Sequence, residues 1–531
     1  MTLPTLAAHP APSAAETLAA LPDPAPSPLL GTAELRAIET WAAAALPPHT
    51  LMQRAGDAAA RWLAMRLADD RRPVWFAAGP GNNGGDALVA AAQLQRLGIE
   101  TEVCMPVDVR PDDARWALER ARAAGVPIAA EPPASFDGYS WLVDGLFGLG
   151  LARPLDGAFA ALADRLAARA RRDGRVLALD LPSGLDSDSG ARVGAGPAVT
   201  ATHTLSFIAA KPGLYMGEGR DLAGEIAVAA LELEPPSAPA VRLNEPSLFA
   251  HALPSRAFAS HKGTYGSVAI VGGDTGMCGA PILAARAALH AGAGKVHVGF
   301  VGAGAPPYDP PYPELMLHPA DALPIESLTA LAIGCGLGAG VPSVRALRTA
   351  LAFDGAKLID ADALNLIAAT PELADALAAC GARGDPAILT PHPLEAARLL
   401  GTDTATVQRD RLAAARALAA RFGAVVVLKG SGTVIVSPDG RTAINPTGSA
   451  ALATGGTGDV LGGLIGAFAA QRMPRYEAAL AGVYLHGLAA DYLVATGAGP
   501  AGLAAGELAP AVRLLLNRRF YARAAAAAPL Y

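Results

Sequence analysis

The stretch Val74-Trp-Phe-Ala-Ala-Gly-Pro-Gly-Asn-Asn-Gly-Gly-Asp86 decides the fold class. Its apolar start predicts a buried strand over Val74–Ala78, and a helix is expected from about Gly85 to Leu97. A strand that runs through a glycine-rich loop into a helix is typical of parallel α/β sheets. The glycines let the backbone approach a phosphate closely, and N–H groups at a helix start favour an anion. The loop therefore predicts a ligand site, with a tight turn that binds nothing as the alternative.

The same alternation of strands and helices continues on both sides of this loop, from residue 32 to residue 230. Further helices are expected over Ala33–Leu46, Leu51–Leu67, Asp112–Ala124 and Phe159–Arg171, and further strands over Thr101–Val107, Trp141–Val143 and Val176–Leu179. Such alternation predicts a Rossmann-like, doubly wound parallel sheet that is covered by helices on both faces.

A proline-rich segment without periodicity, Leu233–Ala240, predicts a linker between two domains. After it the alternation restarts and indicates one large α/β domain. Its strands are expected over Ser267–Val271, Lys295–Gly299, Leu331–Gly334, Lys357–Asp360, Ala387–Thr390 and Ala424–Leu428, and its last helices over Asp459–Ala470, Tyr476–Thr496 and Gly506–Arg519. The predicted plan is a disordered leader rich in Ala and Pro (1–30), a first domain (31–232), the linker (233–240) and a second domain (241–531).

The composition narrows the class of function. A net charge of -6 over 531 residues leaves no basic footprint for nucleic acid or an anionic membrane, and we expect no membrane-spanning segment. The four cysteines are scattered without a CxxC pair, which argues against structural zinc or disulfides and favours a cytoplasmic protein. Helices of small residues such as Ala284–Ala293 suit close packing within a core or between subunits, and we expect a homo-oligomer.

Two aspartates end short strands in the first half of the chain. Trp141-Leu-Val-Asp144 leads into a glycine-rich segment, and Val176-Leu-Ala-Leu-Asp180 leads into Leu181-Pro-Ser-Gly184. The carboxyl ends of parallel strands converge on one crevice, so the Asn, Asp and Ser oxygens here are expected to line a cation site beside the phosphate loop. One such aspartate is commonly a helix cap, but two of them beside a glycine-rich loop favour a site.

A second candidate site stands near the C-terminus, where Thr454-Gly-Gly-Thr-Gly-Asp459 precedes an apolar helical run. Such glycines form an anion pocket that stabilises charge on a transferred phosphoryl group. Asp459 is placed to accept a proton from a hydroxyl that attacks phosphorus, the alternative being that it only favours the helix dipole. Lys429 ends an apolar strand before a loop of small residues, and His392 stands between two prolines, so both are candidates for ligand contact.

The motifs GNNGGD (81–86), DGLFGLG (144–150) and DLPSG (180–184) resemble the N-terminal domain of NAD(P)H-hydrate epimerases over about residues 32–230. The resemblance implies that Asn83, Asp144 and Ser183 hold potassium and that Asp180 moves a proton near the hydrated ring carbon. The implied contacts with the hydrated cofactor are Asn82, Asn83, Gly84, Gly85, Asp86, Gly148, Leu149, Gly150, Leu151, Ala152, Arg153, Pro154 and Asp180. The chain departs from the family at Ala87, where glycine is usual, and in the variable loop Leu149–Arg153.

The second half resembles the ADP/ATP-dependent NAD(P)H-hydrate dehydratases, a branch of the ribokinase-like fold, over about residues 250–495. The motifs that carry the resemblance, besides those of the second site, are HKGTYG (261–266), VGGDTGMCGA (271–280), AGAGKV (291–296), YPELM (312–316), GCGLG (334–338) and DAD (360–362). It implies magnesium with ADP, and Asp459 at the reacting centre. The implied substrate contacts are Ala280, Gly336, His392 and Asp459, and the implied nucleotide contacts are Lys429, Gly430, Ser431, Gly432, Thr433 and Gly458. Departures are Leu394, where the family favours Gly, and Ser449-Ala450, where it favours Asn-Pro.

Together the two resemblances imply repair of hydrated NADH and NADPH. The R and S hydrates would be interconverted, and the S hydrate would be dehydrated while ADP is converted to AMP and phosphate. Hydroxide is a poor leaving group, whereas phosphate departs readily while the ring nitrogen donates electron density. Two other interpretations stay open: a kinase for a small alcohol fused to a nucleotide-binding regulatory domain, and an N-terminal half that only binds a ligand or a partner.

Overall fold

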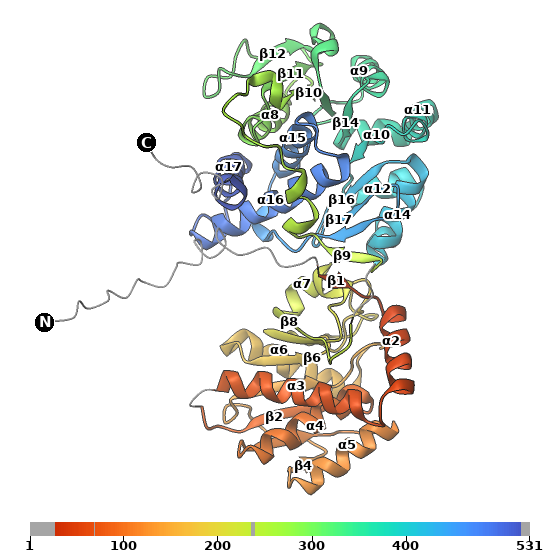
Figure 1. Ribbon diagram of the computed structural model, residues 1–531, viewed down its shortest axis with the longest axis vertical. Helices are drawn as coiled ribbons and strands as arrows, with labels where there is room; N and C mark the ends of the chain where they lie inside the picture. Colours follow the sequence, from red (N-terminus) through yellow and green to blue (C-terminus); the bar gives the residue numbers. More distant parts are fainter. Residues whose placement is uncertain (1–26, 68–69, 235–238, 522–531) are drawn as a thin grey trace, which may run out of the picture. The chain divides into compact units, whose positions relative to one another are not determined.

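The computed structural model describes residues 27–67, 70–234 and 239–521, which form two compact units, Ser27–Arg242 and the segment from Leu243 onward (Figure 1). Residues 1–26 of the predicted leader and residues 235–238 of the predicted linker lie outside the described residues. The composition assigned residues 27–30 to the leader, but strand β1 (Pro28–Leu29) pairs antiparallel with residues 241–242 of strand β9 (Val241–Leu243). The reason is burial, because Leu29 is fully enclosed.

The N-terminal unit is built on a parallel sheet with the strand order β4-β3-β2-β5-β6-β7-β8. Its strands are β2 (Val74–Ala78), β3 (Thr101–Cys104), β4 (Ile128–Ala129), β5 (Trp141–Gly145), β6 (Val176–Leu179), β7 (His203–Phe207) and β8 (Glu225–Ala229). The chain runs outward from β2 to β4 on one side and from β5 to β8 on the other. In a doubly wound sheet such a reversal opens a crevice at the carboxyl ends of the strands. The loops after β2 and β5 are therefore placed to form a site.

Helices cover both faces of this sheet. They are α2 (Thr32–Ala45), α3 (Thr50–Leu67), α4 (Asn82–Arg96), α5 (Asp112–Ala123), α6 (Gly157–Asp173) and α7 (Gly219–Leu222). Successive side chains of a strand point to opposite faces. Phe76 packs with Leu88 of α4 in the core on one face, whereas Trp75 packs with Leu166 of α6 in the core on the other.

The structure differs from the sequence-based expectations at the start of α4 and in three strands of this unit. Helix α4 begins at Asn82 rather than at about Gly85, because the glycines are helical residues that allow close packing. A Cβ atom on Gly84 would lie 1.9 Å from the carbonyl oxygen of Gly79. Strands β4, β7 and β8 were not predicted, since all three are short and β7 contains polar residues at three of its five positions. Strand β4 extends the sheet beyond β3, and β7 and β8 extend it beyond β6.

The C-terminal unit contains a larger sheet, in which the strand order β18-β17-β16-β15-β14-β13-β10-β11-β12 is parallel from β16 to β12 and antiparallel from β18 to β16. Its strands are β10 (Ser267–Gly272), β11 (Lys295–Phe300), β12 (Met316–Pro319), β13 (Ala330–Ile333), β14 (Ala356–Ile359), β15 (Ile388–Leu389), β16 (Val425–Leu428), β17 (Val434–Val436) and β18 (Thr442–Ile444). The direction of winding reverses between β10 and β13. The loops that follow these two strands touch, since the N–H of Asp274 donates to the carbonyl oxygen of Gly336 at 2.7 Å.

Two groups of helices cover this second sheet, with α8, α15, α16 and α17 sharing a core on one face and α9–α12 and α14 lying on the other (Figure 1). Their bounds are α8 (Gly279–His290), α9 (Val341–Ala352), α10 (Ala361–Ala369), α11 (Pro371–Ala382), α12 (Pro393–Leu400), α13 (Thr404–Arg409), α14 (Arg411–Phe422), α15 (Thr457–Ala470), α16 (Arg475–Ala495) and α17 (Leu508–Leu516). The small residues of α8 pack inside the unit, because a Cβ atom on Gly463 of α15 would lie 2.0 Å from the carbonyl oxygen of Ala284. Helix α16 has the length and composition of a membrane span, yet 72% of its most apolar window is buried in the unit.

Candidate active sites

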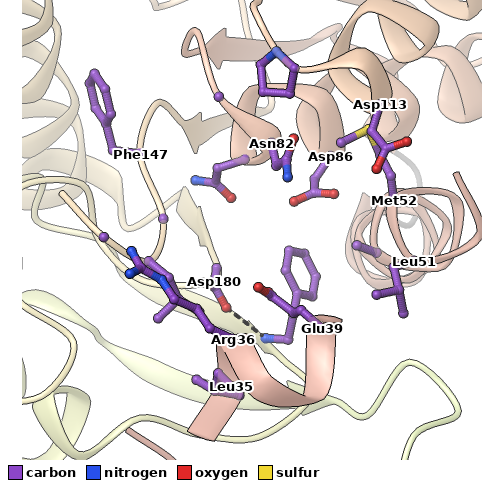
Figure 2. Close-up of a pocket in the computed structure, with 18 of the residues that line it drawn as sticks. Leu35, Arg36, Glu39, Leu51, Met52, Asn82, Asp86, Asp113, Phe147 and Asp180 are labelled. Atoms are coloured by element: carbon purple, nitrogen blue, oxygen red, sulfur yellow. Dashed lines mark hydrogen bonds between the residues drawn. The ribbon is translucent and has the colours of Figure 1, made fainter. Parts of the chain in front are cut away.

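A pocket opens at the reversal point of the N-terminal sheet, between the loops that follow β2 and β5 (Figure 2). The two loops approach so closely that only a glycine fits at position 79. A Cβ atom there would lie 1.7 Å from the carbonyl oxygen of Leu146. The cavity has a volume of about 670 Å³, which suits a small-molecule ligand. The predicted substrate contacts that line it are Asn82, Asn83, Asp86, Gly148, Leu149, Gly150, Leu151, Ala152, Arg153 and Asp180.

Three other residues that were predicted to contact the substrate do not line this cavity. Gly84 faces Gly79, and Gly85 faces Met52, whose Cε atom would lie 2.5 Å from a Cβ atom at that position. Pro154 packs against Gly194, where a Cβ atom would lie 2.7 Å from its Cγ atom. These residues fit a role in close packing of the loops that form the pocket walls.

The predicted potassium ligands Asn83, Asp144 and Ser183 gather beside the pocket. Ser183 donates its hydroxyl to Oδ1 of Asp144 at 2.7 Å and its N–H to Oδ2 at 2.8 Å. Burial raises the pKa of Asp144 to about 6, although the bonds from Ser183 act in the opposite direction. The amide of Asn83 is buried near Gly148, and neither of its polar atoms has a hydrogen-bond partner among the described residues. A buried carboxylate beside an unpaired amide oxygen is a donor set that a cation would satisfy.

Asp180 is held at the pocket wall by a buried ion pair. Its φ is 69°, and its carboxylate contacts the ammonium group of Lys211, which is fully enclosed. Lys211 also donates to the hydroxyl of Ser206 and to the carbonyl oxygen of Phe207, both at 2.9 Å. Figure 2 shows Asp180 at the edge of the cavity, where its Oδ1 atom also accepts the N–H of Phe207 at 3.2 Å. Lys211 was not predicted as a site residue, because it follows the unpredicted strand β7 and no motif marked it.

Three further carboxyl groups line the same pocket, Glu39 from α2, Asp86 from α4 and Asp113 from α5 (Figure 2). Burial raises the pKa of Asp86 well above its usual range, and the charges of Asp180 and Glu39 add to this effect. Partial burial and then the charge of Asp180 raise the pKa of Glu39, although Lys211 acts in the opposite direction. The pocket therefore combines an ion-paired carboxylate with carboxyl groups whose protonated forms are favoured.

The second predicted site lies at the N-terminus of α15. Gly456 precedes the helix with a φ of 90°, and as a glycine it has no side chain to cap the N–H groups of the first turn. These groups favour an anion. Asp459 stands in the same turn and is half-buried. Burial and then the charge of Asp360 raise the pKa of Asp459 to about 6, which suits a group that accepts a proton near neutral pH.

Lys429 brings a positive charge to the same helix start. Its Nζ atom lies 2.7 Å from Oδ1 of Asp360 and 4.0 Å from Oε2 of Glu395. A Cβ atom on Gly458 would lie 3.8 Å from this Nζ atom. Burial disfavours the cation, but the two carboxylates outweigh it and raise the pKa of Lys429. The lysine is therefore a fixed cation beside the anion pocket of α15.

The loop Lys429–Thr433 connects β16 to β17 through glycines in unusual conformations, with a φ of 145° at Gly430 and 67° at Gly432. Arg411, at the start of α14, supports this loop from within the core. Its Nη2 atom donates to the carbonyl oxygens of Leu428 at 3.1 Å and Gly432 at 3.3 Å. Arg411 was not predicted, because a lone arginine in a helical pattern gives no signal of what it supports.

The other predicted substrate contacts of this unit lie at neighbouring strand ends. Gly336, with a φ of 57°, lies against Ala280, whose Cβ atom would be 3.5 Å from a Cβ atom on the glycine. His392 is the N-cap residue that precedes α12, and its Nδ1 atom accepts the N–H of Glu395 at 3.3 Å. Burial and the charge of Lys429 lower the pKa of His392, which favours the neutral ring. Because Nδ1 accepts a backbone N–H, the proton of the neutral ring is assigned to Nε2, which lies 3.2 Å from Oε1 of Glu395. The histidine therefore caps a helix as well as standing near Lys429.

Both halves of the chain match known families. The model of the YjeF-related protein N-terminus matches residues 48–213, and the model of NAD(P)H-hydrate dehydratase matches residues 268–510. The bifunctional NAD(P)H-hydrate repair enzyme of Coxiella burnetii is 39% identical over 498 residues, which cover 91% of this chain and 98% of that protein. The chain belongs to the bifunctional NAD(P)H-hydrate repair enzymes.

Two further relatives match the dehydratase half of this repair enzyme. The ADP-dependent (S)-NAD(P)H-hydrate dehydratase of Neisseria meningitidis is 49% identical over 281 residues, or 51% of this chain and 91% of that protein. The ADP/ATP-dependent NAD(P)H-hydrate dehydratase of Bacillus subtilis, co-crystallised with ATP and Mg²⁺, is 33% identical, covers 51% of this chain and 95% of its own, and has a TM-score of 0.43.

The repair enzyme therefore has NAD(P)H-hydrate epimerase and ADP-dependent dehydratase activities. This confirms the predicted function and the predicted fold class, a Rossmann-like sheet followed by a ribokinase-like domain. The interpretations as a kinase with a regulatory domain and as a binding-only N-terminal half are set aside.

Proposed function

We propose that the N-terminal pocket interconverts the R and S hydrates and that the site at α15 dehydrates the S hydrate. The predicted domain 31–232 would then be the epimerase, and the predicted domain 241–531 the dehydratase. The buried Asp180–Lys211 ion pair supports the first assignment, because it holds a carboxylate at the wall of the cavity. The position of Asp459 in the first turn of α15, near Lys429, supports the second.

In the epimerase site, Asp180 takes a proton from the hydroxyl group of the hydrated ring and later returns it. The residues Asn82–Asp86 and the loop Gly148–Pro154 bind the hydrated cofactor, by direct contact or by shaping the pocket. Lys211 is a positioning residue, since its bonds to Ser206 and Phe207 fix the direction in which the Asp180 carboxylate points.

Potassium fits the donor set of Asn83, Asp144 and Ser183. The observation that supports it is the buried amide of Asn83, whose oxygen has no partner among the described residues. When bound, the ion would neutralise the buried charge of Asp144 and polarise oxygen atoms of the substrate near the loop that begins at Gly148. The three protein oxygens would hold it. Ser183 also links Asp144 to the start of this loop, because its hydroxyl donates to Asp144 and accepts the N–H of Phe147 at 2.9 Å.

In the dehydratase site, Asp459 accepts the hydroxyl proton while the hydroxyl oxygen attacks the β-phosphorus of ADP. AMP leaves with the electron pair of the broken P–O bond, and Lys429 and the N–H groups of α15 stabilise the charge that develops. The ring nitrogen then donates its electron pair, phosphate departs, and loss of a proton from the neighbouring ring carbon restores the reduced nicotinamide.

The remaining predicted contacts of this unit surround that centre. Ala280, Gly336 and His392 bind the hydrated ring, and the loop Lys429–Thr433 with Gly458 binds the nucleotide. Among the residues that the structure describes, no group of three or more His, Cys, Asp or Glu side chains is placed to hold a metal ion. Magnesium would therefore be held chiefly by the nucleotide phosphates, whose charge it neutralises.

A mixture of the two epimers of NADH hydrate tests both assignments in one time course. With ADP and magnesium, the wild type restores nicotinamide absorbance fully. Asp180→Asn should restore the S share at the normal rate and the R share only slowly, because its epimerase is disabled. Asp459→Asn should restore neither share. A normal R phase in Asp180→Asn would overturn the epimerase assignment, and recovery by Asp459→Asn would overturn the dehydratase assignment.

We also propose a cytoplasmic location, whereas the homo-oligomeric state stays a prediction that no contact among the described residues supports. The four cysteines support the first, since all are unpaired and three are buried, as expected in a reducing compartment. The helix that suggested subunit packing, α8, uses its small residues inside the C-terminal unit. Light scattering of the purified chain measures the oligomeric state directly.

A further inference from the structure

We infer that Glu39 of α2 is a second catalytic residue of the epimerase, which donates a proton to the ring nitrogen of the hydrate while Asp180 takes the hydroxyl proton. The inference rests on the proposal that the pocket around Asp180 is the epimerase site. It adds a residue that comes from outside the strand-end loops and that no motif of the sequence marked.

The placement of Glu39 is determined by the helix that carries it. Leu35 and Ala42 of α2 are fully buried, and Glu39 lies four residues after the first and three before the second. Residues at this spacing share one face of a helix, so Glu39 is a carboxyl group on the inward face of α2. Its side chain is open to solvent through the pocket rather than enclosed in the core, and a bound ligand can therefore reach it.

Helix α2 is fixed to the loop that follows Asp180, so the wall of the pocket is preformed. Asp188 accepts the N–H of Thr32 at 2.8 Å, and the hydroxyls of Thr32 and Ser187 lie 2.7 Å apart. The side chain of Glu34 accepts the N–H of Gly31 at 2.9 Å and completes the helix start. These bonds fix the position of Glu39 relative to Asp180, although the two residues lie far apart in the sequence.

The charges around the pocket separate the roles of its carboxyl groups. Glu39 faces Asp180. Partial burial of Glu39 and then the charge of Asp180 raise the pKa of the glutamate and favour its protonated form, while Lys211 and Arg36 act in the opposite direction. Asp86 on α4 faces both carboxyl groups from across the pocket (Figure 2). Lys211 contacts Asp180 directly, whereas Glu39 has no ion-pair partner among the described residues. Carboxyl groups whose environments differ in this way form an acid and a base.

Inversion of the hydroxyl-bearing carbon needs both groups. Asp180 takes the hydroxyl proton, the oxygen forms a carbonyl, and the bond between carbon and ring nitrogen breaks. The electron pair of that bond passes to the nitrogen, which takes the proton of Glu39. After rotation about the adjacent carbon–carbon bond, the nitrogen attacks the other face of the carbonyl and returns its proton to Glu39, while Asp180 returns its proton to the oxygen. No oxidant, reductant or water is consumed.

The test uses full-length chains that carry Asp459→Asn, which removes dehydration, and follows conversion of pure S hydrate to the R form by chiral chromatography. Glu39→Gln should lower kcat by roughly 10²- to 10⁴-fold, as expected for the loss of a general acid. The parent should lose activity as the pH rises through the pKa of Glu39, because the acid form is needed, and Glu39→Gln should lack this limb. Glu39→Asp should keep the limb with a lower kcat.

A matched control is Glu119→Gln, the same chemical change on an exposed position of α5. Unchanged kcat and an unchanged alkaline limb in Glu39→Gln would overturn the inference while leaving the epimerase assignment intact. Loss of the limb in Asp86→Asn but not in Glu39→Gln would assign the proton to Asp86 and also overturn it. Failure of the parent itself to interconvert the epimers would instead refute the proposed site.

Discussion

The Nζ atom of Lys429 lies 2.7 Å from Oδ1 of Asp360, and the charge of the same aspartate raises the pKa of Asp459. One carboxylate therefore adjusts both the cation and the base of the dehydratase site. It does so from the end of β14, where Asp360 also caps α10 by accepting the N–H of Ala361 at 2.8 Å.

The dehydratase should lose activity as the pH falls below about 6, because Asp459 must be deprotonated to accept the hydroxyl proton. Asp360→Asn should move this acidic limb to lower pH, since it removes a charge that raises the pKa of Asp459. The measurement is kcat/KM for the S hydrate as a function of pH. Asp354→Asn, a change at an exposed position, should leave the limb in place. A limb that does not move in Asp360→Asn would mean that another group titrates.

Asp459→Asn should stabilise the C-terminal unit at neutral pH even though it abolishes dehydration. Folding raises the pKa of Asp459 from 3.8 to about 6, so the charged form is disfavoured in the folded state. The resulting loss of stability is absent at pH values below the unfolded pKa and complete above the folded one. The gain for the variant is on the order of 2 kcal/mol at neutral pH and disappears in acid. Calorimetry at both pH values measures it, and a lower melting temperature at neutral pH would contradict the expectation.

Potassium should raise the melting temperature of the N-terminal unit, because the ion binds only the folded site. The effect should be present above a pH of about 6 and lost as the pH falls, since protonation of Asp144 removes the charge that attracts the ion. Ser183→Ala should weaken the effect at every pH. Thermal unfolding in potassium chloride is compared with choline chloride at equal ionic strength. Equal melting temperatures in the two salts would argue against a potassium site.

Arg411→Lys should weaken ADP binding by a change in the loop rather than in the chemistry. Lysine cannot reach the carbonyl oxygens of Leu428 and Gly432 together as the guanidinium group does. We expect KM for ADP to rise by roughly 10-fold, equivalent to about 1.4 kcal/mol, with kcat nearly unchanged. Arg409→Lys, at an exposed position of the preceding helix, is the control. A fall in kcat without a change in KM would place Arg411 in the chemical step instead.

The sequence predicted those parts of the two sites that lie at the ends of predicted strands. The sequence pattern could assign Asp144 and Asp180 to one candidate site and Lys429 to the other, because parallel strands bring their carboxyl ends to one edge of each sheet. Glu39 and Lys211 could not, since their positions depend on how α2 and the segment after β7 pack against that edge. The sequence does show that Glu39 is an acidic residue between the apolar positions of an amphipathic helix. This pattern does not indicate which site the side chain reaches.

The conformation of individual residues was also beyond the sequence pattern. The function of His392 as a helix cap depends on the hydrogen bond between its Nδ1 atom and the N–H of Glu395. The early start of α4 at Asn82 depends on tight packing of Gly84 against Gly79, which only the folded structure reveals. Periodicity locates elements well, but contacts between elements decide where they begin.

The antiparallel pairing of Leu29 with Val241 joins the first and last segments of the N-terminal unit, and α2 begins directly after this strand. During synthesis on a ribosome, Val241 emerges only after every strand of the parallel sheet has been made. The segment that leads into α2 already contacts Ala210, whose carbonyl oxygen accepts the N–H of Leu30 at 3.0 Å, and the pairing with Val241 is the last of its contacts to become available. A nascent chain that stops before Val241 carries all the residues of the pocket but leaves one edge of β1 unpaired until the first residues that follow the linker have been made.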